Sequence, residues 1–125
     1  MINEKTLFCK VNNPQDAADK DSPIAKKHVP VIEVPQEVKA GEFFDAKIKV
    51  GEVEHVSENE HFIQWIEFYI GNVYLGRFDF APVMTKPVVT VSLKLSHSGL
   101  DSTLKAICRC NLHGLWEGTV QIKSK

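Results

Sequence analysis

The sequence predicts an all-β fold, an antiparallel sandwich or barrel of about seven strands. Short segments in which apolar residues alternate with polar ones follow one another from residue 28 to residue 123. Turn-forming pairs, Gly71-Asn72 and Ser98-Gly99 among them, divide these segments. Many short strands separated by turns are typical of antiparallel sheets that pack on one another.

The expected strands differ in how far their side chains should be buried. Residues 28–34 contain Pro30, and we expect an edge strand there because proline lacks a backbone donor. Residues 44–50 alternate apolar and charged side chains, which predicts a strand with one buried face, whereas the apolar run at 61–70 predicts burial on both faces. Further strands are expected at residues 73–80, 89–95, 104–110 and 119–123, the first of them closing a hairpin through Gly71-Asn72.

The first part of the chain differs from the rest. Residues 1–25 are predicted to form a loop-rich N-terminal arm, because they are mixed, polar and rich in turn formers. Only residues 16–20 indicate a short helical turn. Residues 26–125 are expected to form the β-sandwich domain, and a chain of 125 residues has the usual size of one domain.

The composition argues against several classes of function. The formal net charge is −1, so no general attraction to nucleic acid or anionic lipid is expected. No apolar run reaches the roughly 18 residues of a membrane span, and the first ten residues lack the apolar core of a signal peptide. We therefore expect a cytoplasmic protein. In that reducing compartment the three cysteines favour a metal ligand or a buried thiol over disulfides.

Histidine and cysteine side chains in three segments could bind a metal ion. His28 stands at the start of a predicted apolar strand, where a single histidine is usually structural. His55 and His61 are six residues apart across a polar loop, a spacing that is weak support by itself. Cys110 and His113 form a C-x-x-H turn followed by glycine, which fits a metal site as well as a buried thiol beside a turn histidine.

Considered together, four imidazoles and one thiolate indicate iron better than other metals. Structural zinc sites usually have four ligands and are rich in cysteine, and copper electron-transfer sites use two histidines, one cysteine and a weak axial ligand. A square of four nitrogen atoms with one axial sulfur leaves a sixth position open. That position suits an iron ion that binds a small oxygen species directly.

Three segments resemble the superoxide reductase family, which is also called neelaredoxin and forms the catalytic domain of desulfoferrodoxin. The resemblance covers roughly residues 26–123, and the segments occur in the family's order. The chain has the family's K-H-V-P-V-I-E at residues 27–33, its two loop histidines as His55 and His61, its I-x-W-I-E at residues 63–67, and its C-N-x-H-G-L-W at residues 110–116.

The resemblance implies an immunoglobulin-like antiparallel β-sandwich with one mononuclear non-haem iron per chain, cycling between Fe²⁺ and Fe³⁺. It implies one-electron reduction of superoxide to hydrogen peroxide, at an iron position that is open opposite the sulfur. Lys27 would supply positive charge that guides the anion and orients a water as proton donor. The implied equatorial ligands are His28, His55, His61 and His113, and the implied axial ligand is Cys110.

The resemblance also implies partners. The chain resembles the one-iron subclass of the family. The cysteine-rich N-terminal site of desulfoferrodoxin needs four cysteines, and only Cys9 lies in that half of the chain. Members of this subclass are commonly homotetramers. The usual electron donor of the family is a rubredoxin.

Two positions depart from the family pattern. The proline that normally follows the first loop histidine is Val56 here, which we expect to loosen the loop without moving the ligand. The glutamate that often stands two residues before the first ligand histidine is Lys26. We therefore expect water or hydroxide, and no carboxylate from this segment, at the sixth position of the ferric iron. Lys26 is also expected to add to the positive field.

Several other residues near the motifs are expected to be structural. Trp65 and Trp116 are predicted to pack in the core around the site, and Cys108 is predicted to be a buried thiol. His97 matches no ligand and is expected at the surface. The backbone amides of Leu112 and His113 are expected to donate hydrogen bonds to the Cys110 sulfur.

Other functions stay open on the sequence alone. A structural or regulatory module with zinc in a subset of these ligands would have no redox activity. An electron-transfer metal-binding module would also lack superoxide chemistry. A non-haem iron oxygenase commonly uses two histidines and one carboxylate, where this chain offers a thiolate. A sandwich that binds no metal would leave the five candidate ligands unexplained.

Overall fold

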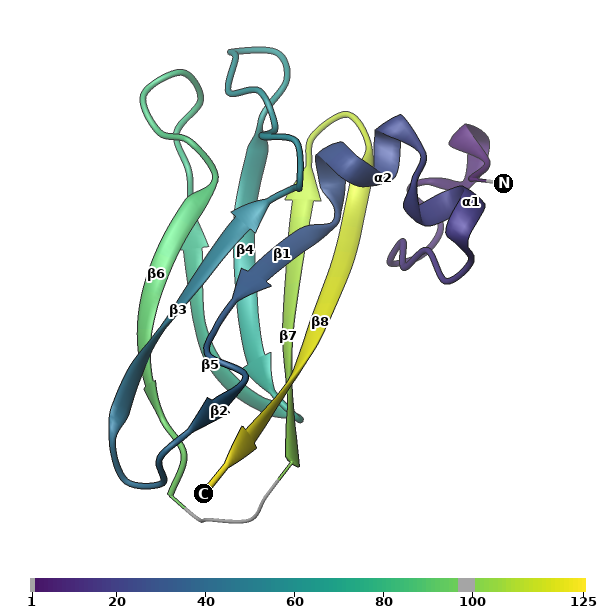
Figure 1. Cartoon of the computed structure of the whole chain (residues 1–125). Coiled ribbons are helices and arrows are strands. Elements are labelled where there is room, and N and C mark those ends of the chain that lie inside the picture. Colours follow the sequence, from purple (N-terminus) through teal and green to yellow (C-terminus); the bar gives the residue numbers. More distant parts are fainter. Residues whose placement is uncertain (1, 97–100) are drawn as a thin grey trace.

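Two β-sheets lie face to face in the computed structural model, which describes residues 2–96 and 101–125 (Figure 1). The smaller sheet has the strand order β1-β3-β6 and the larger has the order β2-β8-β7-β4-β5. The predicted β-sandwich is therefore confirmed, and its described pairs are antiparallel except for β2 with β8. The strands are β1 (Pro30–Glu33), β2 (Glu37–Val38), β3 (Phe43–Val50), β4 (Ile63–Ile70), β5 (Val73–Asp79), β6 (Val88–Lys94), β7 (Asp101–Cys110) and β8 (Gly114–Ser124).

The described residues contain eight strands, where about seven were expected. The extra strand, β2, has only two residues and pairs in parallel with the end of β8. β8 begins at Gly114, earlier than the expected residue 119, because its antiparallel ladder with β7 starts at Cys110. The hairpin predicted at Gly71-Asn72 is confirmed by the pairing of β4 with β5.

One face of β4 is only partly covered. Ile63, Ile66 and Phe68 are buried between the sheets, and an irregularity in the pairing with β7 between Ile63 and Trp65 accounts for their uneven spacing. Trp65 is half-buried, and the guanidinium of Arg77 packs over it at 4.6 Å from the ring centroid. The expected burial on both faces is therefore wrong, because surface side chains cover the outer face of this strand.

A short helix that the sequence pattern did not predict, α2 (Pro23–His28), precedes β1. The Ser22 hydroxyl accepts a hydrogen bond from a backbone amide of the first turn at 3.3 Å, and Pro23 occupies that turn, where proline is favoured. The helix ends before Pro30, because the residue that precedes a proline is driven to an extended conformation. His28 is therefore the last residue of a helix and not the first of a strand.

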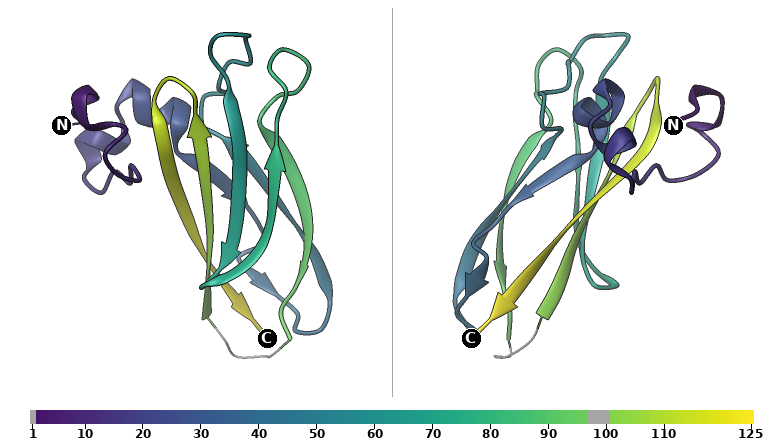
Figure 2. Two further views of the ribbon diagram at one scale, coloured as in Figure 1. Left: turned by 180° about the vertical axis from the view of Figure 1, so that it is seen from behind. Right: turned by 45° about the vertical axis from the view of Figure 1, so that its right-hand side comes forward.

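The N-terminal arm packs along β8 (Figure 2). Its helices η1 (Glu4–Thr6) and α1 (Ala17–Lys20) confirm the expected loop-rich arm with a helical turn. The backbone amide of buried Asn12 donates to the carbonyl of Leu115 at 2.8 Å, and its side-chain amide donates to the carbonyls of Leu7 at 2.9 Å and Leu115 at 2.8 Å. These bonds fix the arm beside the turn between β7 and β8.

The core lies between the two sheets. Trp116, Phe68 and Ile48 are the largest of the fully buried side chains. The alternation expected for residues 44–50 is confirmed, because Ala46, Ile48 and Val50 are buried. Among the described helices, none has both the length and the apolar character needed to cross a membrane.

Gly118 on β8 marks a close approach between the two sheets. A Cβ atom there would lie 2.0 Å from the carbonyl oxygen of Pro30. We expect Gly118→Ala to lower the free energy of unfolding by about 1–3 kcal/mol, because the two backbones must move apart to admit a methyl group. Chemical denaturation of the variant and the natural protein measures the difference.

Gly76→Ala is the matched control for this change. Gly76 lies on the edge strand β5, and the nearest atom to a Cβ there belongs to Phe78 at 3.9 Å, an ordinary contact. This substitution should change the free energy of unfolding by no more than about 0.5 kcal/mol. Equal losses of stability in the two variants would contradict the prediction.

Candidate metal centre

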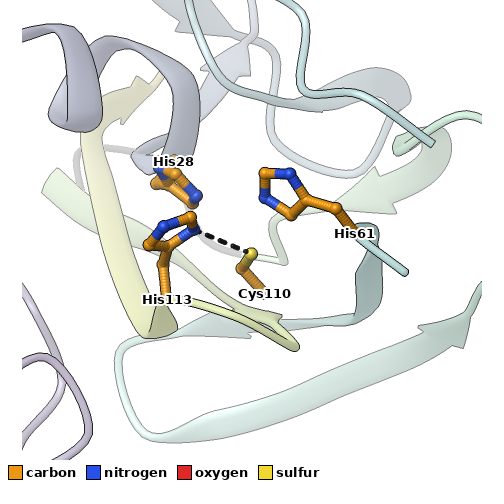
Figure 3. Close-up of side chains that lie close together, drawn as sticks. All are labelled: His28, His61, Cys110 and His113. Carbon is orange, nitrogen blue, oxygen red and sulfur yellow. Dashed lines mark hydrogen bonds between the residues drawn. The ribbon is translucent and has the colours of Figure 1, made fainter. Parts of the chain in front are cut away.

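The side chains of His28, His61, Cys110 and His113 point toward one another at one end of the sandwich (Figure 3). They come from the end of α2, the connection between β3 and β4, and the turn between β7 and β8, which lie at the same end of the molecule in Figure 1. One ligand atom can be chosen from each residue so that all four atoms lie within 4.8 Å of one another. The group is a His/Cys metal-binding cluster.

A further histidine, His55, lies beside this group, with its ring against those of His28 and His61. The four imidazole rings occupy the corners of a near-square, whose successive centroids are 4.6–5.1 Å apart. The centroids of His28 and His61, which lie across the diagonal, are 6.4 Å apart. The sides of the square join His28 to His55, His55 to His61, His61 to His113, and His113 to His28.

Backbone carbonyls fix which ring nitrogen faces the cluster. Nδ1 of His28 lies 2.7 Å from the carbonyl oxygen of Ile24, and Nδ1 of His55 lies 2.7 Å from that of Val56. A carbonyl only accepts, so each Nδ1 carries the proton and each Nε2 keeps a free lone pair. Nε2 of His28, His55 and His61 is buried and has no hydrogen-bond partner. Three such atoms in neighbouring rings are donors that a cation could pair, because buried polar atoms are otherwise paired.

The turn between β7 and β8 presents the sulfur and the last ring. Nδ1 of His113 lies 3.5 Å from Sγ of Cys110. Gly114 follows with a φ of 81°, a conformation that favours glycine. A Cβ at this position would also lie 2.7 Å from the carbonyl oxygen of Leu7 in the arm. Both the turn and the arm packed against it therefore require the glycine of the C-x-x-H-G motif.

Asn111 ties this turn to the loop that carries His61. Its side-chain carbonyl accepts from the backbone amide of Phe62 at 3.0 Å, and its side-chain amide donates to the carbonyl of Glu60 at 2.9 Å. Its backbone amide donates to the carbonyl of Phe62 at 3.2 Å. The residues on both sides of His61 are thus held by the residue that follows Cys110.

The loop between His55 and His61 is also held by hydrogen bonds. The backbone amide of His55 donates to the carbonyl of Val50 at 2.9 Å. The hydroxyl of Ser57 donates to the carbonyl of Thr85 at 2.6 Å and accepts from the amide of Val83 at 3.0 Å. These bonds attach the loop to β3 and to the connection between β5 and β6, with valine in the place of the family's proline.

Burial keeps the histidine rings neutral. It lowers the pKa of His28 to about 3 and that of His55 to about 4, and it also lowers the pKa of His113. Burial raises the pKa of the Cys110 thiol, and the backbone amides of Leu112 and His113 oppose this by donating to the sulfur, as expected from the turn. Neutral imidazoles bind metal ions, and the charge of a bound ion would hold the thiol as a thiolate.

The two lysines of α2 have different surroundings. Lys27 is exposed, and after burial, which is the main cause, its positive charge contributes to lowering the pKa of His55. Lys26 is half-buried and lines a cavity of about 280 Å³ to which Glu52 and Glu117 also contribute. The charge of Lys27 therefore acts on the cluster, whereas Lys26 borders a separate, partly acidic cavity.

The other residues singled out in the sequence fall in three places. Cys108 is a buried thiol, as predicted, and its Sγ donates to the carbonyl of His28 at 3.3 Å. Trp116 is in the core beside the cluster, as predicted, but Trp65 lies on the outer face of β4. His97 lies outside the described residues. The sequence pattern did not predict the contacts of Trp116 or the roles of the Ile24 and Val56 carbonyls, since every residue has a carbonyl.

Comparisons with known proteins agree with this site. Residues 20–119 match the family Desulfoferrodoxin. A protein of Methanocaldococcus jannaschii is 42% identical over 113 residues, which cover 90% of this chain and 92% of the relative. The superoxide reductase of Pyrococcus horikoshii is 36% identical, over 78% of this chain and 89% of the relative. A solved structure of the superoxide reductase (neelaredoxin) from Ignicoccus hospitalis superposes with a TM-score of 0.78 at 37% identity, over 99% of this chain and 100% of that one.

Acid should destabilise the metal-free protein. Burial lowers the pKa of His28 from 6.5 to about 3, so below pH 6.5 the unfolded chain binds more protons than the folded chain. The stability tied to this ring is complete above pH 6.5 and is lost as the pH falls from 6.5 toward 3, at up to about 1.4 kcal/mol per pH unit. Denaturant titrations of chelator-treated protein, from about pH 7.5 to about 4.5, measure the slope.

His28→Gln tests the origin of this slope. The variant lacks one ring that is neutral when folded and protonated when unfolded, so its stability should fall less steeply over the same range. A slope as steep as that of the natural protein would show that His28 does not cause the acid sensitivity.

Proposed function

We propose that the chain, which belongs to the desulfoferrodoxin family, is a superoxide reductase that binds one iron ion. The observation that carries the proposal is the square of four imidazoles beside the Cys110 sulfur, in a chain related to proteins named superoxide reductases. The proposed ligand atoms are Nε2 of His28, His55 and His61, Nδ1 of His113, and Sγ of Cys110.

The donor set fits iron better than zinc. Structural zinc sites are tetrahedral and mostly cysteine, whereas this site offers five donors, of which one is sulfur. Iron held by these donors would supply the single electron that turns superoxide into peroxide, and two protons from solvent would complete hydrogen peroxide.

Cys110 is proposed to supply the one sulfur donor of the site. Its thiolate is stabilised by the amides of Leu112 and His113, which place two N–H dipoles against the sulfur. His28 and His55 keep their lone pairs toward the ion, because the carbonyls of Ile24 and Val56 hold the opposite nitrogen of each ring. The chain thus presents neutral nitrogen donors in fixed orientations around one charged sulfur.

Lys27 is proposed to act on the substrate directly. Superoxide is an anion, and an exposed ammonium that already acts on His55 attracts it toward the cluster. Nζ of Lys27 would also orient a water molecule that supplies one of the two protons needed to form hydrogen peroxide. Lys26 is proposed to contribute less to this field, because it borders another cavity, which Lys20, Glu52 and Glu117 also line.

The partners and location are proposed from the family relationship. We propose a rubredoxin or a similar small protein as the electron donor and a homotetramer as the assembly. We propose the cytoplasm as the location, because a reducing compartment keeps thiols such as Cys9, Cys108 and Cys110 free.

Purified protein should contain about one iron per chain by elemental analysis, and its oxidised form should show a thiolate-to-iron absorption band. Cys110→Ser should abolish that band, because it removes the sulfur. In assays with superoxide, each molecule consumed should yield one molecule of hydrogen peroxide without release of oxygen, whereas dismutation would yield one peroxide for every two.

The fourth nitrogen ligand is tested by a pair of histidine variants. His55→Gln should lower the iron content, and His97→Gln, which alters a histidine outside the three motif segments, should not. A colourless zinc protein without activity toward superoxide would overturn the proposed function. Iron content unchanged in His55→Gln would remove only His55 from the ligand set.

Lys27→Met should slow the reaction of the reduced protein with superoxide by about ten-fold at low ionic strength and weaken its dependence on salt. Lys26→Met, which removes the neighbouring charge on the same helix, should have a much smaller effect. Pulse-radiolysis rates over a range of salt concentrations make the comparison. Equal effects of the two substitutions would contradict a specific role for Lys27.

A further inference from the structure

We infer that Trp116 is a positioning residue that holds two of the proposed iron ligands, His28 and His113, in the orientation that the metal needs. The inference rests on the proposed function only in placing a metal ion at the cluster. Trp116 lies on β8, is fully buried, and contacts both ligand segments.

The first contact is between two rings. The indole of Trp116 stacks on the imidazole of His28, with ring centroids 5.1 Å apart and planes inclined by 25°. The edge of the same imidazole is held by the carbonyl of Ile24, 2.7 Å from Nδ1. One contact restrains the face of the ring and the other restrains its edge, so Nε2 stays directed at the cluster.

The second contact is a hydrogen bond to the main chain. Nε1 of Trp116 donates to the carbonyl of His113 at 3.0 Å. His113 is only half-buried, so its own surroundings restrain it less than those of His28. The bond fixes the peptide group of His113 and keeps its ring where Nδ1 lies 3.5 Å from the Cys110 sulfur.

The residue paired with Trp116 across the sheet supports the same ligand. Cys108 on β7 is in register with Trp116, and its Sγ donates to the carbonyl of His28 at 3.3 Å. This cross-strand pair therefore contacts both the ring and the main chain of His28. Packing alone would explain why the indole is buried. It does not explain why the indole N–H group donates to the carbonyl of His113, a proposed ligand residue.

Trp65 provides the matched comparison, because it is the only other tryptophan in the sequence. It is half-buried on the outer face of β4, where it contacts Arg77. Trp65→Phe removes the same N–H group and the same ring area as Trp116→Phe. It does so at a position that does not contact the proposed ligands.

The test compares Trp116→Phe with Trp65→Phe in the full-length, iron-loaded protein. Trp116→Phe keeps an aromatic face toward His28 and removes the donor to His113. We expect ferrous iron to pass to a chelator about 10–100 times faster than in the natural protein, because partners that orient metal ligands typically change affinity by this factor. The thiolate-to-iron band of the oxidised protein should also shift. Trp65→Phe should change neither property.

A second replacement covers the case in which Trp116→Phe does not fold. In the Trp65→Phe background, benzothienylalanine incorporated in place of tryptophan occupies position 116 only. It has nearly the shape of tryptophan, with sulfur in place of the N–H group. Faster iron release from this protein would support the inference through the hydrogen bond alone.

The inference is overturned if both replacements at position 116 release iron at a rate within about two-fold of Trp65→Phe and leave the absorption band in place. None of these measurements uses superoxide. A protein that binds iron but does not reduce superoxide would end the proposed function, while the release rates would still decide the role of Trp116.

Discussion

Three buried imidazole nitrogen atoms without a hydrogen-bond partner are the constraint on which the rest of this structure depends. They belong to His28, His55 and His61, which come from a helix end and a loop that are separate in sequence. A buried polar atom left unpaired costs about 1–3 kcal/mol, so the folded chain holds these rings together at a cost. Burial lowers the pKa of His28 and of His55, because the loss of water disfavours the protonated ring by more than the carbonyls of Ile24 and Val56 stabilise it. A cation bound by these atoms would pair their free lone pairs, and metal binding would thereby be coupled to folding.

The sandwich supplies the rigid part of this arrangement and the loops are attached to it. The ladder between β7 and β8 runs without interruption up to Cys110, so the sulfur is placed by strand geometry and not by a loop. Asn111 then attaches the loop of His61, and Asn12 attaches the arm against the same turn. Gly114 adopts the positive φ that the turn needs, and its lack of a side chain leaves room for the arm. The bonds of Asn111 end on the two residues that flank His61, so this part of the polar network holds a proposed ligand in place.

Much of this could be predicted from the sequence, and the rest depends on contacts that leave no pattern. Alternation at residues 44–50 predicted a half-buried strand because a strand repeats every two residues. The five candidate ligands, together with the family resemblance of their segments, indicated the cluster. The six-residue helix α2 is too short to show a helical period, so His28 was assigned to the wrong element although Ser22-Pro23 marks the helix start. The tautomers of the rings depend on carbonyl oxygens, and the stacking of Trp116 on His28 depends on how β8 meets α2. Neither can be inferred from residue types alone.

The choice of neutral nitrogen ligands has a consequence for an anionic substrate. A divalent ion held by four neutral imidazoles and one thiolate keeps a net positive charge, because the sulfur cancels only part of it. A carboxylate at the place of Lys26 could cancel the remainder, and the chain instead has a lysine there that borders the cavity shared with Glu52 and Glu117. Lys27, one residue further along α2, adds positive charge close enough to influence His55. Two consecutive lysines on one helix thus face different surroundings, since successive helical residues point in directions about 100° apart. In the proposed function an ion bound at this site would attract an anion together with Lys27, without further charge from the rest of this nearly neutral protein.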